Sequence, residues 1–206
     1  MEKKSIPDIV VGRLPLYLRS IQRMAQEGRK VTSSQELGER LGISAAQIRK
    51  DLSQFGEFGK QGTGYQINYL INQLSKILHV DRIWDIAIVG AGDVGNAVVR
   101  YQGFANRGFR ISMIFDNDPA KIGTQMGDFI VRNTANLIED IREQNVKVAM
   151  IAVPANQGQK VADQLIKAGV KAILNYAPIS LYVPADVYVQ YIDPAIHLQR
   201  MTYYLD

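Results

Sequence analysis

The first eighty residues repeat apolar side chains at the spacing of helices. A first helix with one buried face, ending near Gly28, is predicted by apolar residues that recur every three or four positions: Leu14, Tyr17, Leu18, Ile21 and Met24. A helix that closes this part of the chain is predicted by a second series: Ile67, Leu70, Ile71, Leu74 and Ile77. Residues 79–84 are then a short connection.

Two shorter helices between these are predicted from their end signals. Ser33 and Glu36 have the spacing of a capping box, and Gly42 supplies a left-handed stop. Ser44 and Gln47 form a second capping box directly after Gly42, so the two helices meet through a tight turn. This order predicts a helix-turn-helix arrangement.

The second of these short helices has two contrasting faces. One face is apolar and is expected to pack on the core: Ala45, Ile48, Leu52 and Phe55. The opposite face carries small, amide and cationic side chains that suit a major groove: Ala46, Lys50, Ser53 and Gln54, flanked by Gln47 and Arg49. An ordinary solvated helix face explains the same pattern, so this helix alone does not decide for DNA.

Residues 55–66 hold four glycines and three aromatic side chains. The glycines permit a tight hairpin, in which Phe58 and Tyr65 are expected to pair across the strands. A hairpin directly after a recognition helix is a winged helix, and its tip, with Lys60 and Gly62, is expected to contact the DNA backbone or the minor groove. A plain β-turn is the alternative.

From Ile86 onward, short apolar runs alternate with helical segments. The run from Ile86 to Val89 is typical of a buried parallel strand and is followed at once by a GxGxxG segment: Gly90, Ala91, Gly92, Asp93, Val94 and Gly95. A strand before this segment and a helical pattern after it are the context that a dinucleotide-binding fingerprint requires. We expect Gly90 to allow the turn, Gly92 to admit a pyrophosphate and Gly95 to let helix and strand pack closely, with the phosphates held at the helix N-terminus.

The next strand, residues 111–115, ends at Asp116, which lies 21 positions beyond Gly95 (116 − 95 = 21). A carboxylate at this place accepts hydrogen bonds from a ribose 2′-hydroxyl and repels a 2′-phosphate, and Asn117 is no arginine. The spacing therefore favours NAD over NADP. An Asx turn is the alternative role for Asp116, and the two roles can coexist.

The alternation continues to the end of the chain. We predict a helix at 134–144, a strand at 148–153, a helix at 158–168 and strands at 172–174 and 187–189. Such an order implies a doubly wound parallel sheet, whose ligands bind at the carboxyl ends of the strands. Candidates for the nicotinamide side of this crevice follow the later strands: Val153, Pro154, Asn175, Tyr176, Ala177 and Pro178.

A last helix is predicted to begin at Asp193, an N-cap residue followed by proline. Its apolar residues lie on two faces: Leu198, Met201 and Leu205 on one, Ile196 and Tyr203 on the other. A helix that is apolar on two faces needs cover on both sides. A dimer mate, the front domain or both would provide it, and simple packing of the terminus is the alternative.

Composition limits the function classes. The 206 residues are 47% hydrophobic and 21% charged, which is typical of a globular chain of one or two domains. No apolar run suits a membrane span and the N-terminus lacks a signal-peptide pattern, so we expect a cytoplasmic protein. There are no cysteines and two histidines, His79 and His197, so metal chemistry is not expected.

Charge separates the two parts of the chain. Residues 1–80 hold 12 Lys/Arg and 7 Asp/Glu (+5), and residues 81–206 hold 12 and 13 (−1), in line with the total of +4. A basic front part suggests a polyanion partner, although a solvated surface would carry the same charge.

An NAD site suggests a dehydrogenase, but the residues for hydride-transfer catalysis are not evident. Such an enzyme needs an acid–base group and a substrate domain, and the residues after 84 suffice for little more than a nucleotide fold. Neither histidine lies at a predicted strand end, and the back part shows no Tyr-x-x-x-Lys pair.

The combined order resembles a known family. The stretch from Ser44 to Gln66, followed by Gly90–Gly95, Asp116 and Asn175–Pro178, is similar to the redox-sensing repressors of the Rex family of bacteria over nearly the whole chain. The resemblance implies a homodimer that represses genes from palindromic double-stranded operators and is released by NADH, with NAD⁺ competing weakly or favouring the DNA-bound form.

The resemblance also implies roles for single residues. Arg49 and Lys50 match operator-contacting residues, Lys60 matches the wing and Gly90–Gly95 match the pyrophosphate loop. Tyr101 matches a tyrosine that approaches the nicotinamide across the dimer. Arg19 and Asp193 match an ion pair between the front helix of one subunit and the terminal helix of the other, a helix that the family exchanges between subunits.

Together these patterns predict an α/β protein. A winged-helix DNA-binding domain spans 1–80, a Rossmann-like NAD(H)-binding domain spans 81–193, and an exchanged dimerisation helix spans 194–206. We expect uncharged, reduced nicotinamide to enter the apolar crevice near Tyr101 and Tyr176 more readily than the cationic oxidised ring. The alternatives are a small NAD-dependent oxidoreductase with a fused DNA-binding module, and a regulator that responds to coenzyme A.

Overall fold

The computed structural model describes residues 6–60 and 63–205, and of Lys60 the backbone alone. The chain divides into two units between Arg82 and Ile83. The sequence analysis placed the division after Val80, inside the same connecting segment.

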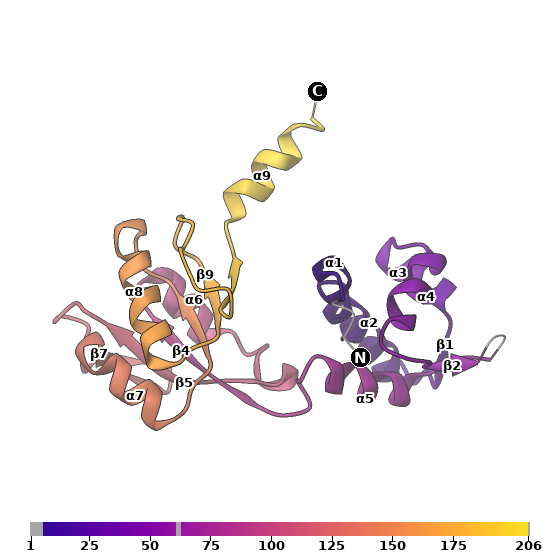
Figure 1. The fold of residues 1–206 in the computed structure, drawn as a ribbon, viewed down its shortest axis with the longest axis horizontal. Helices are drawn as coiled ribbons and strands as arrows, with labels where there is room; N and C mark the ends of the chain where they lie inside the picture. Colours follow the sequence, from indigo (N-terminus) through magenta and orange to yellow (C-terminus); the bar gives the residue numbers. More distant parts are fainter. Residues whose placement is uncertain (1–5, 61–62, 206) are drawn as a thin grey trace. The chain divides into compact units, whose positions relative to one another are not determined.

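The first unit combines helices with a small antiparallel sheet (Figure 1). Its elements are α1 (Asp8–Val11), α2 (Leu14–Gln26), β1 (Val31–Thr32), α3 (Ser34–Leu41), α4 (Ala45–Ser53), β2 (Gly59–Lys60), β3 (Gly64–Gln66) and α5 (Ile67–Ile77). The strands lie in the order β1-β3-β2. The apolar series that predicted α2 and α5 form the core of this unit, whereas the short helix α1 was not predicted.

The turn between α3 and α4 is built as its end signals predict. Ser33 Oγ accepts a hydrogen bond from the backbone N–H of Glu36 (3.1 Å), and Ser44 Oγ accepts one from the backbone N–H of Gln47 (3.2 Å). Gly42 ends α3 in the left-handed region, with φ of 67°. The helix-turn-helix prediction is therefore confirmed.

The hairpin after α4 forms, but its predicted aromatic pair does not. The residue opposite Tyr65 is Gly59, not Phe58. Phe58 precedes the paired residues and is 8% exposed in the helical core. Burying an aromatic ring in that core removes more apolar surface from water than a pair on a short hairpin would.

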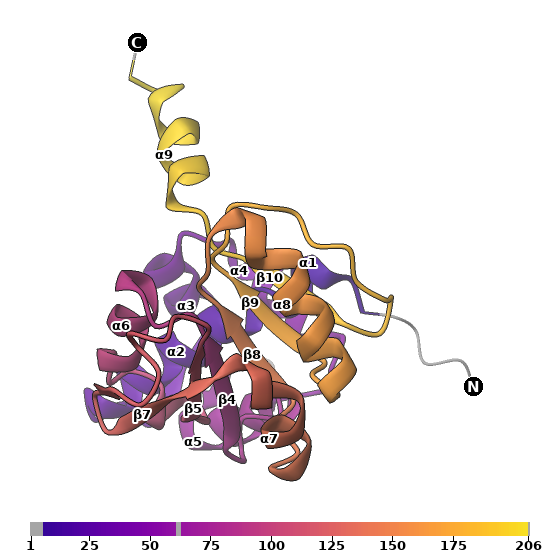
Figure 2. The same ribbon diagram turned by 90° about the vertical axis from the view of Figure 1, so that its left-hand side faces the viewer.

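The second unit alternates strands and helices (Figures 1 and 2). Its elements are β4 (Trp84–Val89), α6 (Asp93–Arg100), η1 (Ala105–Arg107), β5 (Phe109–Asp116), β6 (Gln125–Met126), β7 (Phe129–Asn133), η2 (Thr134–Asn136), α7 (Leu137–Glu143), β8 (Val148–Ile151), α8 (Ala155–Ala168), β9 (Ala172–Asn175), β10 (Tyr188–Tyr191) and α9 (Pro194–Thr202).

The described strands of this unit lie in the order β10-β9-β8-β4-β5-β7-β6. Adjacent strands from β10 to β7 are parallel, and β6 pairs with β7 in the antiparallel direction. Helices α7 and α8 cover one face of the sheet and α6 lies on the other (Figure 2). The chain order reverses between β4 and β8, which is where a doubly wound sheet binds its ligands.

Helix α8 begins earlier than predicted, at Ala155 rather than Gly158. Strand β8 correspondingly ends at Ile151 and not at Val153. Gly158 lies inside the helix because the loop after β9 packs closely there, and a Cβ on Gly158 would lie 3.3 Å from the Cβ of Ala177. What looked like a helix start is a close helix–loop contact.

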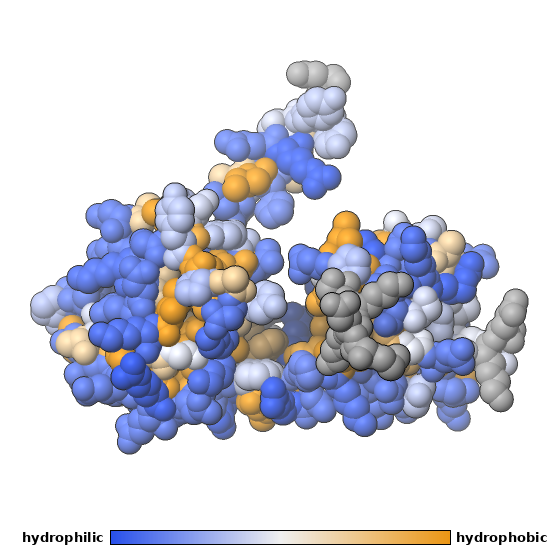
Figure 3. Space-filling view, in the orientation of Figure 1, coloured by the Kyte–Doolittle hydropathy of each residue, from blue (hydrophilic) through white to orange (hydrophobic). Residues whose placement is uncertain are grey.

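Helix α9 projects from the second unit with its side chains exposed. Asp193 caps it by accepting a hydrogen bond from the backbone N–H of Ala195 (2.9 Å). All residues of α9 are described and none of them is buried. One hydrophobic patch is visible on this helix, near the sheet, among hydrophilic residues in the space-filling view (Figure 3).

Within residues 6–60 and 63–205, no helix combines the length and apolar character that crossing a membrane requires.

Candidate functional site

The loop after β4 brings three glycines into one tight turn. A Cβ on Gly95 would lie 1.9 Å from the carbonyl oxygen of Gly90, so only glycine lets α6 pack this closely. Gly90 has φ of 108°, and a Cβ there would lie 2.2 Å from the carbonyl oxygen of Ala152. A Cβ on Gly92 would meet no atom within 4 Å. Gly90 and Gly95 thus serve packing, whereas Gly92 borders open space where a ligand can approach the backbone.

Helix α6 starts directly at this loop, with Gly92 as its N-cap. The N–H groups of a first helical turn and the helix dipole favour an anion at such a position. Asp93 and Val94 in this turn are exposed. A carboxylate repels a phosphate and a valine side chain has no donor, so the backbone N–H groups of this turn are the groups that fit a phosphate. The loop therefore has the shape and polarity for a pyrophosphate.

Asp116 lies at the end of β5 and reaches this loop. Its Oδ2 accepts a hydrogen bond from the backbone N–H of Ala91 (2.7 Å), and its Oδ1 accepts one from the backbone N–H of Asp118 (2.9 Å). Lys121 Nζ lies 3.4 Å from Oδ2. Burial alone would raise the pKa of Asp116, but the two N–H groups and Lys121 outweigh it and lower that pKa. The carboxylate is therefore ionised, and the Asx turn that was the alternative role of Asp116 is present.

A cavity of about 320 Å³ opens at the carboxyl edge of the sheet, between the ends of β4, β5, β7 and β8. Of the predicted site residues, Gly90, Asp116 and Val153 line it. Sequence reasoning missed its polar residues on α8 and at the end of β7: Asn133, Thr134, Asn156, Gln157, Lys160 and Gln164. The available signal for the residues on α8 was the polar stretch directly after the strand that begins at Val148. Because the helix was predicted to start later, this stretch was not recognised as a helix start that borders the site.

The segment after β9, predicted for the nicotinamide side, does not line this cavity. Asn175 is buried, and its side chain is used within the turn. Its Nδ2 donates to the carbonyl oxygens of Ala177 and Ile179 (both 3.0 Å), and its Oδ1 accepts from the N–H of Ala177 (3.0 Å). Tyr176 is half-buried, and burial raises the pKa of its phenol. Asn175 thus shapes the turn that presents Tyr176 and Pro178.

Tyr101 caps the C-terminal end of α6 and lies outside the cavity. It is 47% exposed, packs edge-on against Phe104 with ring centroids 5.0 Å apart, and accepts a hydrogen bond from Arg107 (3.2 Å). Its ring is therefore available to a partner.

On the first unit, α4 presents the polar face that the sequence predicts. Five of the predicted DNA-contacting residues are exposed. Four of them have polar or charged side chains and one has a methyl side chain: Arg49, Lys50, Ser53, Gln54 and Ala46. Arg49 donates to Ser34 Oγ (3.0 Å), and Ser53 Oγ donates to the carbonyl oxygen of Lys50 (2.9 Å). Gly62 lies outside the described residues, and the side chain of Lys60 is not described.

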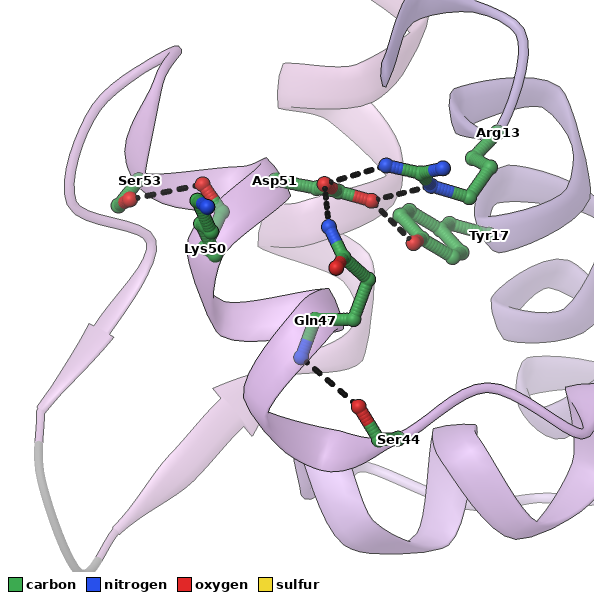
Figure 4. Close-up of polar contacts among 7 residues, drawn as sticks. All are labelled: Arg13, Tyr17, Ser44, Gln47, Lys50, Asp51 and Ser53. Atoms are coloured by element: carbon green, nitrogen blue, oxygen red, sulfur yellow. Dashed lines mark hydrogen bonds and ion pairs between the residues drawn. The ribbon is translucent and has the colours of Figure 1, made fainter. Parts of the chain in front are cut away.

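Gln47 is half-buried and differs from its neighbours, because its amide donates to Asp51 (2.6 Å). Asp51 is a buried carboxylate that also accepts hydrogen bonds from Arg13 and Tyr17 (Figure 4). Sequence reasoning missed this cluster, since Arg13 and Asp51 are 38 positions apart. The available signal for the cluster was that Asp51, an acidic residue, lies on the inner face of an amphipathic helix.

Arg19 is exposed on α2 and Asp193 caps α9. The two residues belong to different units, and their ion pair stays a prediction. In the described part of the chain, no group of three or more His, Asp or Glu side chains is placed to hold a metal ion.

Two family models match the chain. Residues 5–53 match the model described as "Putative DNA-binding protein N-terminus", and residues 81–179 match the model described as "CoA binding domain". The first match lies in the first unit, and the second match lies in the second unit except for residues 81 and 82.

Curated relatives match over almost their whole length. The "Redox-sensing transcriptional repressor Rex" of Chloroflexus aggregans is 54% identical over 97% of this chain and 94% of its own. The protein of the same name from Desulforamulus reducens is 42% identical over 100% of this chain and 98% of its own.

Solved structures cover residues of both units. The crystal structure of RSP in complex with β-NAD⁺ and operator DNA has a TM-score of 0.93 and 36% identity, covering 98% of this chain and 93% of that one. The structure of RSP in complex with β-NADH has a TM-score of 0.88 and 34% identity, covering 97% and 94%. RSP is described as a Rex-family repressor.

Proposed function

The chain belongs to the Rex family of redox-sensing transcriptional repressors, and from this premise we propose how its own residues bind operator DNA and NAD(H). The observation that carries the proposal is the glycine loop beside Asp116, with open space at Gly92. The exposed polar face of α4 supplies the DNA side.

The first unit binds double-stranded operator DNA through α4 and the β2–β3 hairpin. Ala46, Lys50, Ser53 and Gln54 lie on the face that enters the major groove, flanked by Gln47 and Arg49. Lys60 and Gly62 are proposed to contact the DNA backbone or the minor groove, although Gly62 lies outside the described residues. The basic charge of this part of the chain attracts the phosphates.

The second unit binds NADH and NAD⁺ at the carboxyl edge of its sheet. The backbone of the glycine loop and the first turn of α6 hold the pyrophosphate, and Asp116 accepts a hydrogen bond from the adenosine ribose. The neighbouring cavity, with Lys160 and Gln164, takes the adenosine half. Val153, Pro154 and the Asn175–Pro178 turn border the nicotinamide side.

Two chains form a homodimer in which α9 is exchanged. A helix with six large apolar side chains exposed within or just after it needs cover, and a second copy of this chain provides it: Ile196, Leu198, Met201, Tyr203, Tyr204 and Leu205. Palindromic operators match such a two-fold protein. Tyr101 of one chain then contacts the nicotinamide bound by the other.

NADH releases DNA because it prefers one arrangement of this dimer. A ligand shifts an equilibrium only by its different affinities for the two states. Reduced nicotinamide is uncharged and enters the apolar crevice near Tyr101 and Tyr176 at a lower desolvation cost than the cationic ring. The Arg19–Asp193 pair is formed in one arrangement and broken in the other.

The alternative functions carry different weight. Because the family consists of transcriptional repressors, the oxidoreductase alternative is set aside. The family model for coenzyme A domains favours a coenzyme A ligand as the second candidate, but the RSP complexes hold NAD⁺ and NADH. We further propose that the chain needs no metal and acts in the cytoplasm, where bacterial operators lie.

An operator titration tests the proposal. The chain is bound to a palindromic DNA library at one fixed salt concentration, with NADH, NAD⁺ or coenzyme A added in separate arms, since phosphate contacts make affinity depend on salt. We expect selection of a palindrome and release by NADH alone. Release by coenzyme A alone would show that the ligand is coenzyme A and not NADH. Equal affinity for all DNA sequences would contradict the proposed function.

A further inference from the structure

Asp51 is a buried carboxylate on the inner side of the recognition helix α4. Its side chain is 0% exposed. Oδ2 accepts hydrogen bonds from Arg13 Nε and Tyr17 OH (both 2.6 Å), and Oδ1 accepts from Arg13 Nη2 (2.7 Å) and Gln47 Nε2 (2.6 Å) (Figure 4). Apolar residues of the same volume often stabilise a core as well as a buried ion pair does. This cluster therefore raises the question of what it positions.

The cluster fixes the orientation of the Gln47 amide. A carboxylate only accepts hydrogen bonds, so the atom that faces Asp51 is Nε2, and Oε1 points elsewhere. One N–H of Gln47 is thereby held by Asp51. Its other N–H and Oε1 remain as a neighbouring donor and acceptor. This pair matches the major-groove edge of adenine, which offers N7 as acceptor and the N6 amino group as donor.

The position of Gln47 suits such a contact. It lies in the first turn of α4, and its backbone N–H is held by Ser44 Oγ (3.2 Å). Lys50 and Ser53 project from the side of α4 away from Arg13 and Tyr17, and Gln47 lies between these two sides (Figure 4). Gln47 is half-buried, so part of the residue is open to solvent while its Nε2 donates to Asp51.

We infer that Arg13, Tyr17 and Asp51 are positioning residues for operator reading, which hold Gln47 so that its amide recognises an adenine in each half-site. This inference rests on the proposed binding of operator DNA. A side chain already held in one rotamer loses little conformational freedom on binding, so the contact discriminates more strongly between bases.

The test compares base preferences position by position, with the full chain and a randomised palindromic half-site. Gln47→Ala is expected to lower discrimination about tenfold at one position, where the wild type selects adenine. Asp51→Asn is expected to lower it by a similar factor at the same position, since an Asn oxygen cannot accept all these hydrogen bonds. Tyr17→Phe removes one hydroxyl and is expected to lower it about threefold there.

Glu27→Gln is the matched control. It breaks the two-bond ion pair between Glu27 and Arg40 (3.0 and 2.7 Å) in the same unit without touching α4. It is expected to leave every base preference unchanged. If Asp51→Asn does not fold, Tyr17→Phe and Arg13→Lys decide the outcome.

Three results would overturn the inference. Tyr17→Phe and Asp51→Asn could weaken binding to all sequences alike, as a purely structural role requires. Gln47→Ala could leave every preference intact, or the position it affects could be one where the wild type does not select adenine. A wild-type chain that selects no palindrome would instead contradict the proposed function, and the inference with it.

Discussion

Ala91 donates its backbone N–H to the carboxylate of Asp116 across 2.7 Å. This hydrogen bond joins the glycine loop after β4 to the end of β5, the two strands that hold the proposed pyrophosphate and ribose. The loop is thus fixed by the chain itself, before a ligand contributes any contact. A site that is already formed loses less conformational entropy when its ligand binds.

Gly92→Val is expected to weaken NADH binding while the fold persists. The new Cβ meets no atom within 4 Å, so stability changes by about 1 kcal/mol, the scale of an N-cap substitution. The side chain would fill the space that the pyrophosphate needs, and affinity for NADH should fall at least about tenfold. Calorimetric titration with NADH and thermal unfolding measure the two effects.

Gly95→Ala is the contrasting variant, because its Cβ would lie 1.9 Å from the carbonyl oxygen of Gly90. It should destabilise the second unit by about 2 kcal/mol or more. Unchanged NADH affinity in Gly92→Val would place the dinucleotide elsewhere.

Asp193→Asn separates two roles of Asp193. Asparagine caps a helix about as well as aspartate, so α9 should form normally, but the charge that pairs with Arg19 is lost. We expect the variant to bind operator DNA like the wild type and to need more NADH for release. Operator titrations with increasing NADH measure this. A normal NADH response in Asp193→Asn, together with a weakened one in Asp193→Ala, would assign Asp193 to capping alone.

Leu198→Asp is expected to weaken the proposed dimer. Leu198 is 61% exposed on α9, so its loss costs the folded chain itself little. Burying a charge in the proposed interface should raise the dimer dissociation constant at least about tenfold. Sedimentation velocity over a range of concentrations measures it, with Gln199→Asp on the same helix as the control. Equal dimerisation of both variants would count against exchange of α9.

Tyr17→Phe is expected to change how stability depends on alkaline pH. Burial, together with the hydrogen bond to Asp51, raises the pKa of Tyr17 from 10.0 to about 12. Because the pKa of Tyr17 is higher in the folded chain than in the unfolded chain, its proton stabilises the fold fully at pH values below the unfolded-state pKa. This stabilisation is lost as the pH rises through the folded-state pKa. The wild type should therefore exceed the variant by about 1–3 kcal/mol below pH 10, and the difference should shrink towards pH 12.

Urea unfolding followed by circular dichroism, at several pH values, measures this difference. Titration of the other groups cancels in the comparison of two chains that differ at Tyr17 alone. A difference that stays constant from pH 9 to about 12 would show that the Tyr17 proton does not stabilise the fold.

Lys50→Ala is expected to reduce the salt dependence of operator binding. If Lys50 neutralises a phosphate, its removal lowers the slope of log affinity against log salt by about one for each half-site. Lys167→Ala, an exposed change on α8, is the control and should leave the slope unchanged. An unchanged slope in Lys50→Ala would mean that Lys50 contacts no phosphate.

Local sequence signals predicted most of the fold. Ser33, Gly42 and Ser44 mark helix ends through bonds within a few residues, and the spacing of Gly95 and Asp116 follows from one strand–helix–strand unit. Such features depend on neighbouring backbone, so a single chain pattern reveals them.

Features that depend on distant contacts were not predictable in the same way. Asp51 becomes a buried acceptor only because Arg13 arrives from another helix. Gly158 looked like a helix start because its contact with the loop after β9 is invisible in sequence. Phe58 could pair on the hairpin or enter the core, and only the packed helices decide between them.

The exposed helix α9 has a consequence for how this protein tolerates mutation. In the proposed homodimer, each substitution on α9 occurs twice, once in each copy, and each copy meets a partner surface encoded by the same gene. A modest loss of binding energy at one contact of α9 therefore counts twice in the assembled repressor. A substitution on the partner surface that compensates for this loss also occurs twice. Substitutions in this terminal helix and in the surface that it contacts are therefore expected to depend on one another within one gene.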